Sequence, residues 1–193
     1  MKHLRVRLVL AAAAAGALAI AVVAVATAGG GHGIREKLTG YQEVPAQSTP
    51  GTGTFQASID RSAREIHYRL SYGHLESPAT QSHIHFENRT NAGPIVVFLC
   101  TNLGNGPAGT QACPPNGGTV TGTIKPADVG AGAAGQGLAA GEFDELVRAI
   151  RAGATYVNVH TTGRPSGEIR AQLVDDRGDH GDHGDHGDHG DSH

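Results

Sequence analysis

The stretch at 82–86 reads Ser-His-Ile-His-Phe, and a second stretch at 156–161 reads Tyr-Val-Asn-Val-His-Thr. Both are typical of β-strands, in which residues i and i+2 lie on the same face. His83 and His85 therefore share one face of the first strand, and His160 lies opposite the two valines of the second. Ile84 and Phe86 take the opposite face of the first strand. If these residues and the valines pack in the core, all three histidines lie on faces away from it. Two such strands placed close together would bring three imidazole groups to one place.

Other segments indicate many short strands joined by turns. Residues 65–71 alternate cleanly, with Ile66, Tyr68 and Leu70 on one face and polar residues on the other. Glycine is frequent and tryptophan is absent, a composition that suits strands and turns better than helix packing. One helix is expected at 142–152, where apolar residues recur at spacings of three and four. Further strands are expected at 38–45, 53–60, 80–86, 94–99, 119–125, 156–161 and 168–174. These elements predict an all-β, antiparallel sandwich or barrel with one short helix.

The N-terminus has the pattern of a secretory signal peptide at 1–28. A basic start is followed by an uninterrupted apolar run at 8–25 and by the small-residue pattern Ala-Thr-Ala at 26–28. The run is long for a signal, so an uncleaved membrane anchor is the alternative. In both cases we expect the domain to lie outside the cytoplasm, secreted or at the cell surface. We expect no membrane span after signal cleavage.

A glycine-rich leader at 29–35 precedes one domain at 36–174, and a tail at 175–193 follows it. The tail repeats Asp-His-Gly and has no apolar residue to bury from 179 onward, so we expect it to be disordered. Alternating carboxylate and imidazole groups suit loose chelation of a divalent metal. A solvating tail without a specific ligand is the equal alternative. The histidines concerned are His180, His183, His186, His189 and His193.

Cys100 and Cys113 flank a loop rich in Gly, Pro and Asn. Outside the cytoplasm we expect them to form one disulfide. A thiolate metal site is the alternative, although two cysteines without Cys-x-x-Cys spacing indicate it only weakly.

Several function classes lack their usual signals. The net charge of −3, without a basic cluster in the domain, argues against nucleic acid as a main partner. No phosphate-binding loop or dinucleotide fingerprint occurs. Ser166 lies in a Pro-Ser-Gly turn rather than in a nucleophile elbow, which argues against a serine hydrolase.

Five segments, at 38–45, 83–85, 91–96, 153–161 and 165–170, resemble the CHRD domain in their order and spacing. That domain is named for its repeats in chordin, an animal extracellular antagonist of bone morphogenetic proteins, and also occurs singly in secreted bacterial proteins. The resemblance covers 36–174. Ala171 stands where the family usually has Gly, and the loop between the cysteines looks like an insertion. The resemblance implies an immunoglobulin-like β-barrel and an extracellular place, but no reaction.

A strand His-x-His pair with a histidine from a distant strand also resembles the copper site of copper–zinc superoxide dismutase, which lies on the outside of a Greek-key barrel. The match here would be His83, His85 and His160, without a loop histidine to bridge a second metal. Three neutral imidazoles with an open position would suit copper or zinc.

The alternative is a structural role, in which these histidines hydrogen-bond the backbone or neighbours such as Glu87, Glu168 or Asn158. Glu168 and Arg170 face the same way on their strand, so we expect them to form a surface pair of little energetic weight.

The leading hypothesis is a secreted or cell-surface binding module that binds a metal ion through the three histidines and has an extracellular protein or surface partner. A mononuclear copper enzyme with dismutase-like chemistry is one alternative. A purely structural or adhesive surface protein is the other.

Overall fold

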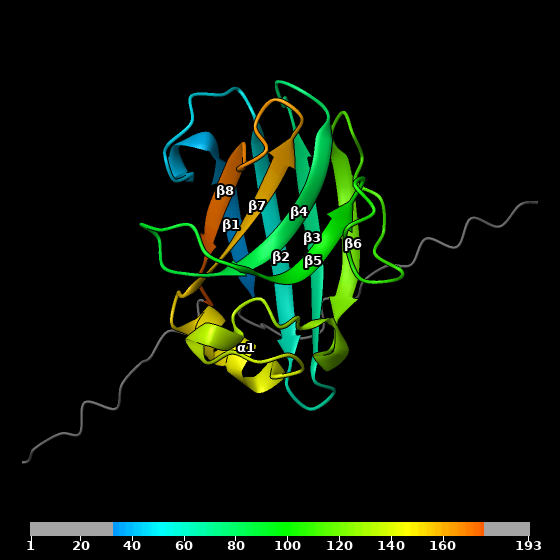
Figure 1. The fold of residues 1–193 in the computed structure, drawn as a ribbon, viewed down its shortest axis with the longest axis vertical. Helices are drawn as coiled ribbons and strands as arrows, with labels where there is room; N and C mark the ends of the chain where they lie inside the picture. Colours follow the sequence, from blue (N-terminus) through cyan, green and yellow to red (C-terminus); the bar gives the residue numbers. More distant parts are fainter. Residues whose placement is uncertain (1–32, 176–193) are drawn as a thin grey trace, which may run out of the picture. The chain divides into compact units, whose positions relative to one another are not determined.

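The computed structural model describes residues 33–175. The expected signal peptide, most of the leader and the tail with its five histidines lie outside the described residues. Eight strands form one antiparallel sheet in the order β5-β4-β7-β8-β1-β2-β3-β6 (Figure 1). The strands are β1 (Ile34–Thr39), β2 (Thr52–Asp60), β3 (Glu65–Gly73), β4 (Ala79–Phe86), β5 (Ile95–Thr101), β6 (Gly118–Ile124), β7 (Thr155–Thr161) and β8 (Ile169–Leu173).

The sheet curls into a nearly closed barrel because its two edge strands, β5 and β6, come together. They are not hydrogen-bonded neighbours in the sheet, so a seam remains between them. Side chains bridge it: Tyr68 donates to the carbonyl of Leu99, and the Gln111 amide donates to the carbonyl of Thr121 and to the Tyr68 hydroxyl. The expected all-β antiparallel fold is confirmed.

Helix α1 (Phe143–Arg151) lies at the end of the barrel where the β2–β3 hairpin turns (Figure 1). Its apolar stripe is buried, and acidic residues open the helix while Arg148 and Arg151 close it, as the helix dipole favours. Short 3₁₀ turns occur at Gly40–Gln42, Pro126–Asp128 and Ala134–Gln136. No helix within residues 33–175 has the length and apolar character needed to span a bilayer.

The first strand differs from the expectation. We expected it at 38–45, whereas β1 pairs with β2 from Ile34 to Thr39 and then ends. The chain turns back at Gly40, whose carbonyl accepts from the backbone N–H groups of both Glu43 and Gln47. This turn removes Glu43 from the sheet and places its side chain in a buried position.

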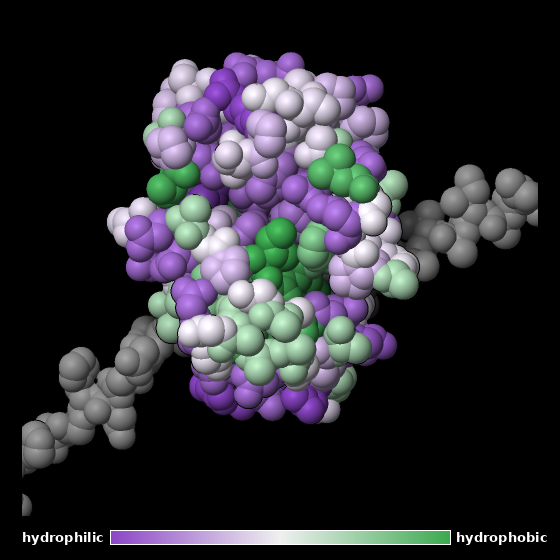
Figure 2. Space-filling model, in the orientation of Figure 1, coloured by the Kyte–Doolittle hydropathy of each residue, from purple (hydrophilic) through white to green (hydrophobic). Residues whose placement is uncertain are grey.

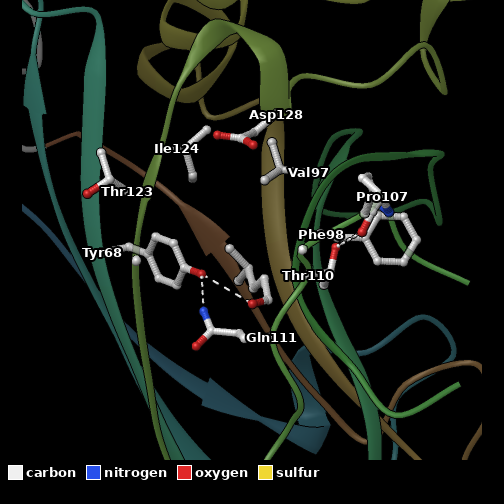
Figure 3. A pocket seen from close by; sticks show the side chains of 13 residues that line it. Tyr68, Val97, Phe98, Pro107, Thr110, Gln111, Thr123, Ile124 and Asp128 are labelled. Atoms are coloured by element: carbon white, nitrogen blue, oxygen red, sulfur yellow. Dashed lines mark hydrogen bonds between the residues drawn. The ribbon is translucent and has the colours of Figure 1, made fainter. Parts of the chain in front are cut away.

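A disulfide joins Cys100 to Cys113, as expected. It closes the loop that follows β5, and the backbone N–H of Thr101 donates to the carbonyl of Gln111 inside that loop. A cavity of about 320 Å³ lies at the seam. Figure 3 shows Phe98 and Pro107 on one side of it and Tyr68 with Gln111 on the other. Figure 2 shows apolar side chains gathered in a hollow in the middle of the face in view.

Candidate metal site

Strands β4 and β7 are antiparallel neighbours although more than 60 residues separate them in the chain. In their register His83 faces Asn158 and His160 faces Gln81, so His160 lies diagonally across from His83. The ring centroids of His83 and His160 are 5.0 Å apart, those of His83 and His85 5.4 Å, and those of His85 and His160 6.0 Å. The fold therefore brings the three histidines together.

The cluster is buried, although it faces away from the apolar residues of the barrel core. His83 is 0 % exposed, and His85 and His160 are each 6 % exposed. Phe98 of β5 covers His83, with ring centroids 4.4 Å apart in an edge-to-face contact. The outer face of this part of the sheet is thus a second buried layer, rather than a solvated surface.

Backbone carbonyls hold two of the rings in one orientation. Nδ1 of His85 donates to the carbonyl of Gly93 at 2.8 Å, and Nδ1 of His160 donates to the carbonyl of Pro165 at 2.9 Å. Because these nitrogens carry the protons, Nε2 of each neutral ring presents a lone pair. This is how outer hydrogen bonds orient histidines that bind metals.

Nδ1 of His83 lies 3.2 Å from Nε2 of His160. Nε2 of His83 and Nε2 of His85 are buried and have no hydrogen-bond partner. One ligand nitrogen from each ring lies within 4.8 Å of the other two. Nitrogens bound tetrahedrally to one zinc ion lie about 3.3 Å apart, so modest ring rotation would let all three bind a single ion.

The charge state of the cluster suits a cation. Burial lowers the pKa of His83 to about 2, and the neighbouring His160 and His85 add to this effect. Burial lowers the pKa of His85 to about 4, against the opposing hydrogen bond to Gly93. Burial also lowers the pKa of His160, against its hydrogen bond to Pro165. All three rings are therefore neutral near pH 7 and can act as ligands.

A stack of side chains supports His85 from the side. The Tyr156 ring lies parallel to the His85 ring, with centroids 4.6 Å apart, and the Arg170 guanidinium lies 3.4 Å from the Tyr156 centroid. Arg170 donates to the carbonyls of Asn88 and Asn91, and the Tyr156 hydroxyl accepts from the N–H of Gly93. These hydrogen bonds hold the loop between β4 and β5 beside the cluster.

The expected surface pair of Glu168 and Arg170 is wrong. Glu168 is 0 % exposed and Arg170 is 1 % exposed. The Glu168 carboxylate accepts from the Thr49 and Thr161 hydroxyls and from the N–H of Glu76, while Arg170 donates to loop carbonyls. Loops from other parts of the chain cover this face of β8, so both side chains are structural.

Glu43 is the residue near this layer that sequence reasoning did not identify. It is 7 % exposed, and its Oε1 has no hydrogen-bond partner. Burial raises its pKa to about 7, against the opposing effects of Arg170 and Asn158. The sequence around Glu43 has no periodic pattern that would predict its burial near the histidines, because the turn after β1 is what places it there.

The remaining described histidines do not join the cluster. His67 lies on β3, where its Nδ1 is 3.0 Å from the Thr123 hydroxyl. His74 follows β3 and lines a shallow depression with Lys37 and Ser71. Among residues 33–175, the group able to hold a metal ion consists of His83, His85 and His160.

Comparison with protein-family models matches residues 34–173 to the CHRD domain. No curated protein matches the chain, and no solved structure matches it.

Proposed function

The chain belongs to the CHRD domain family, and we propose that it is a binding module of this type in which His83, His85 and His160 hold one transition-metal ion. Copper and zinc are the candidates, because both accept neutral imidazole ligands. Three such ligands leave one position open, through which the ion could take a group from a partner molecule.

The observation that carries this proposal is the group of unpartnered lone pairs at the site. Among residues 33–175, buried side-chain atoms without a hydrogen-bond partner occur at Glu43, His83, His85, Thr155 and Asn158. The two histidine nitrogens in this set belong to rings that contact each other. A buried polar atom without a partner costs about 1–3 kcal/mol. A cation bound by these nitrogens would remove that cost.

Metal analysis tests the proposal on the full chain with its five tail histidines replaced by asparagine (His180→Asn and the same change at 183, 186, 189 and 193), so that the tail does not bind the metal. We expect one equivalent of copper or zinc. His83→Ala and His160→Ala should each abolish stoichiometric binding, whereas His67→Ala, the matched exposed histidine, should leave it unchanged. The site would be refuted if the tail-substituted chain bound no metal, or if His160→Ala still bound a full equivalent.

A redox reaction at bound copper is the second candidate. The open coordination position supports it, and the complete burial of His83 argues against it because small oxidants would reach the ion slowly. Superoxide turnover by the copper-loaded tail variant separates the two candidates. If the protein binds one equivalent of copper but does not turn over superoxide, the binding-module hypothesis remains and the redox hypothesis is rejected.

We further propose that the protein acts outside the cytoplasm, secreted or at the cell surface. The disulfide between Cys100 and Cys113 supports this location, because structural disulfides persist in oxidising compartments. Fractionation of the producing cells, with N-terminal sequencing of the exported chain, tests both the location and cleavage after residue 28. An unprocessed chain in the cytoplasm would contradict it.

A further inference from the structure

Glu43 has a buried carboxyl group whose surroundings do not satisfy all of its hydrogen-bonding capacity. The backbone N–H of Glu43 donates to the carbonyl of Gly40, which fixes the turn that carries the side chain inward. Its Oε1 is buried without a hydrogen-bond partner. A second buried carboxylate in the same layer, Glu168, instead accepts three hydrogen bonds. Hydrogen bonding to loops therefore accounts for the burial of Glu168, but it does not account for Oε1 of Glu43.

The backbone at Gly167 is shaped around the Glu43 carboxyl group. Gly167 has a φ of +128°, which side chains rarely permit. A Cβ atom there would collide with Oε1 of Glu43 and would lie 2.9 Å from Nδ2 of Asn158. The chain thus approaches Glu43 and Asn158 as closely as a residue without a side chain allows.

Asn158 connects this carboxyl group to the histidine cluster. It lies on β7 directly opposite His83 and on the same face as His160. After burial and Arg170, Asn158 is the next influence on the pKa of Glu43, and it also acts on the pKa of His85. Oδ1 of Asn158 is itself buried without a partner. Oxygen and nitrogen lone pairs without donors therefore extend from the cluster to Glu43.

An ion at the cluster would introduce a charge that the three ligands do not offset, because all three rings are neutral. A buried cation is costly unless an opposite charge lies nearby. The charged and titratable groups that act on Glu43 are Arg170 and, reciprocally, Tyr156. Arg170 is itself positive, so it adds to the need for an anion. Among residues 33–175, Glu43 is the acidic side chain that has a buried oxygen without a hydrogen-bond partner.

We propose that Glu43 is the positioning carboxylate of the metal site: it orients Asn158 beside His85 and supplies the negative charge that offsets the bound ion. This inference rests on the proposed metal site. It assigns the ion's charge balance to a residue more than 35 positions away from any of the three histidines, on a different element of the fold.

The test compares Glu43→Gln with wild type in the full chain carrying the five tail substitutions. Zinc affinity is measured by competition with a chelator, and the visible spectrum is recorded with cobalt alone as the probe. We expect Glu43→Gln to weaken zinc binding about 10–100-fold, as loss of an outer carboxylate partner does, and to shift the cobalt bands. The melting temperature of the metal-free protein should stay the same or rise, because the variant removes a buried acid one of whose oxygens has no hydrogen-bond partner.

Glu168→Gln is the matched control, since it changes a second buried carboxyl group in the same way, one that accepts from three donors. It should lower the melting temperature and leave the cobalt spectrum and zinc affinity unchanged. Equal zinc affinity in Glu43→Gln and wild type would overturn this inference while leaving the metal site intact. Equal weakening by both variants would also overturn it, because the effect would then be structural. Absence of metal from the wild-type cluster would overturn the proposed function as well.

Discussion

At the scale of single residues, the central feature is an imidazole with no access to water. His83 is 0 % exposed and packs between Phe98 and His160. A proton added to this ring would place a charge in a layer that already contains Arg170. Neutral histidines buried in this way make folding sensitive to acid.

We predict that the metal-free protein loses stability as the pH falls from 6.5 towards 4. The ordinary pKa of histidine is 6.5, and in the folded protein those of His85 and His83 are about 4 and about 2. Below pH 6.5 the unfolded chain takes up protons that the folded protein does not, so the free energy of unfolding decreases. Urea unfolding at pH 7.5, 6.5, 5.5 and 4.5 measures this dependence.

Glu43 acts in the opposite direction over part of this range. Its pKa is raised from 4.5 to about 7, so between these values the folded protein binds a proton that the unfolded chain does not. Its contribution therefore increases stability on acidification and offsets about one of the three histidines. Glu43→Gln should make the loss of stability steeper between pH 6.5 and 4.5. Stability that is flat or rising in both proteins would contradict the neutral state of the cluster.

At the scale of elements, the pairing of β4 with β7 brings the three histidines together. The barrel stays open at the seam between its edge strands, β5 and β6. The pair places His160 diagonally across from His83. At the seam, no strand ladder continues the sheet, and the loop closed by Cys100 and Cys113 supplies the bridging amide of Gln111. The disulfide therefore holds in place the loop that closes the barrel.

We predict that the double variant Cys100→Ser with Cys113→Ser is destabilised by about 3 kcal/mol, the chain-entropy value for a loop of this length. The sequence separation of the two cysteines is 13. Urea unfolding at pH 7.5 measures the change, and wild type unfolded in the presence of a reductant is the control. The two should agree. A change below about 1 kcal/mol would show that the seam is held without the loop.

At the scale of the whole molecule, the proposed metal site would link metal binding to folding. The three histidines of the candidate site come from two strands distant in sequence, and the carbonyls that orient two of them come from two further loops. The unfolded chain does not hold these groups together, so an ion that binds the site favours the folded state.

We predict that zinc at 100 times its dissociation constant stabilises the tail-substituted chain by about 2.7 kcal/mol. For a domain of this size that corresponds to a rise in melting temperature of roughly 10 °C. Calorimetry with and without zinc measures it, and EDTA should reverse it. His160→Ala should show no rise. An equal rise in that variant would assign the effect to zinc bound elsewhere.

Much of the fold could be predicted because strand alternation is a local signal. The segment at 65–71 became β3, the segment at 142–152 became α1, and the pair of histidines on β4 shares one face. The predicted position of the first strand is wrong, because the strand ends at a turn at Gly40 that the apolar pattern does not encode. The disulfide could be predicted because the chain has only two cysteines.

The site could be predicted only in part. The spacing of His83 and His85 places two candidate ligands on one face of a strand, and the strand at 156–161 adds His160 as a third candidate. The cover over them could not be predicted, because it comes from Phe98 and from loops around Gly93 and Pro165. For the same reason the sequence predicts a surface position for Glu168 and Arg170, although both are buried.

The amino-acid pattern was enough to show which residues alternate and which share a face, because backbone geometry repeats every two residues in a strand. It also showed which cysteines can pair, because the chain has only two. The folded structure was needed to show that β4 lies beside β7, that the outer face of these strands is covered and that Glu43 is buried near the cluster. Strand neighbours and loop positions depend on packing between segments that are far apart in the chain. The local period of a sequence contains no information on that packing.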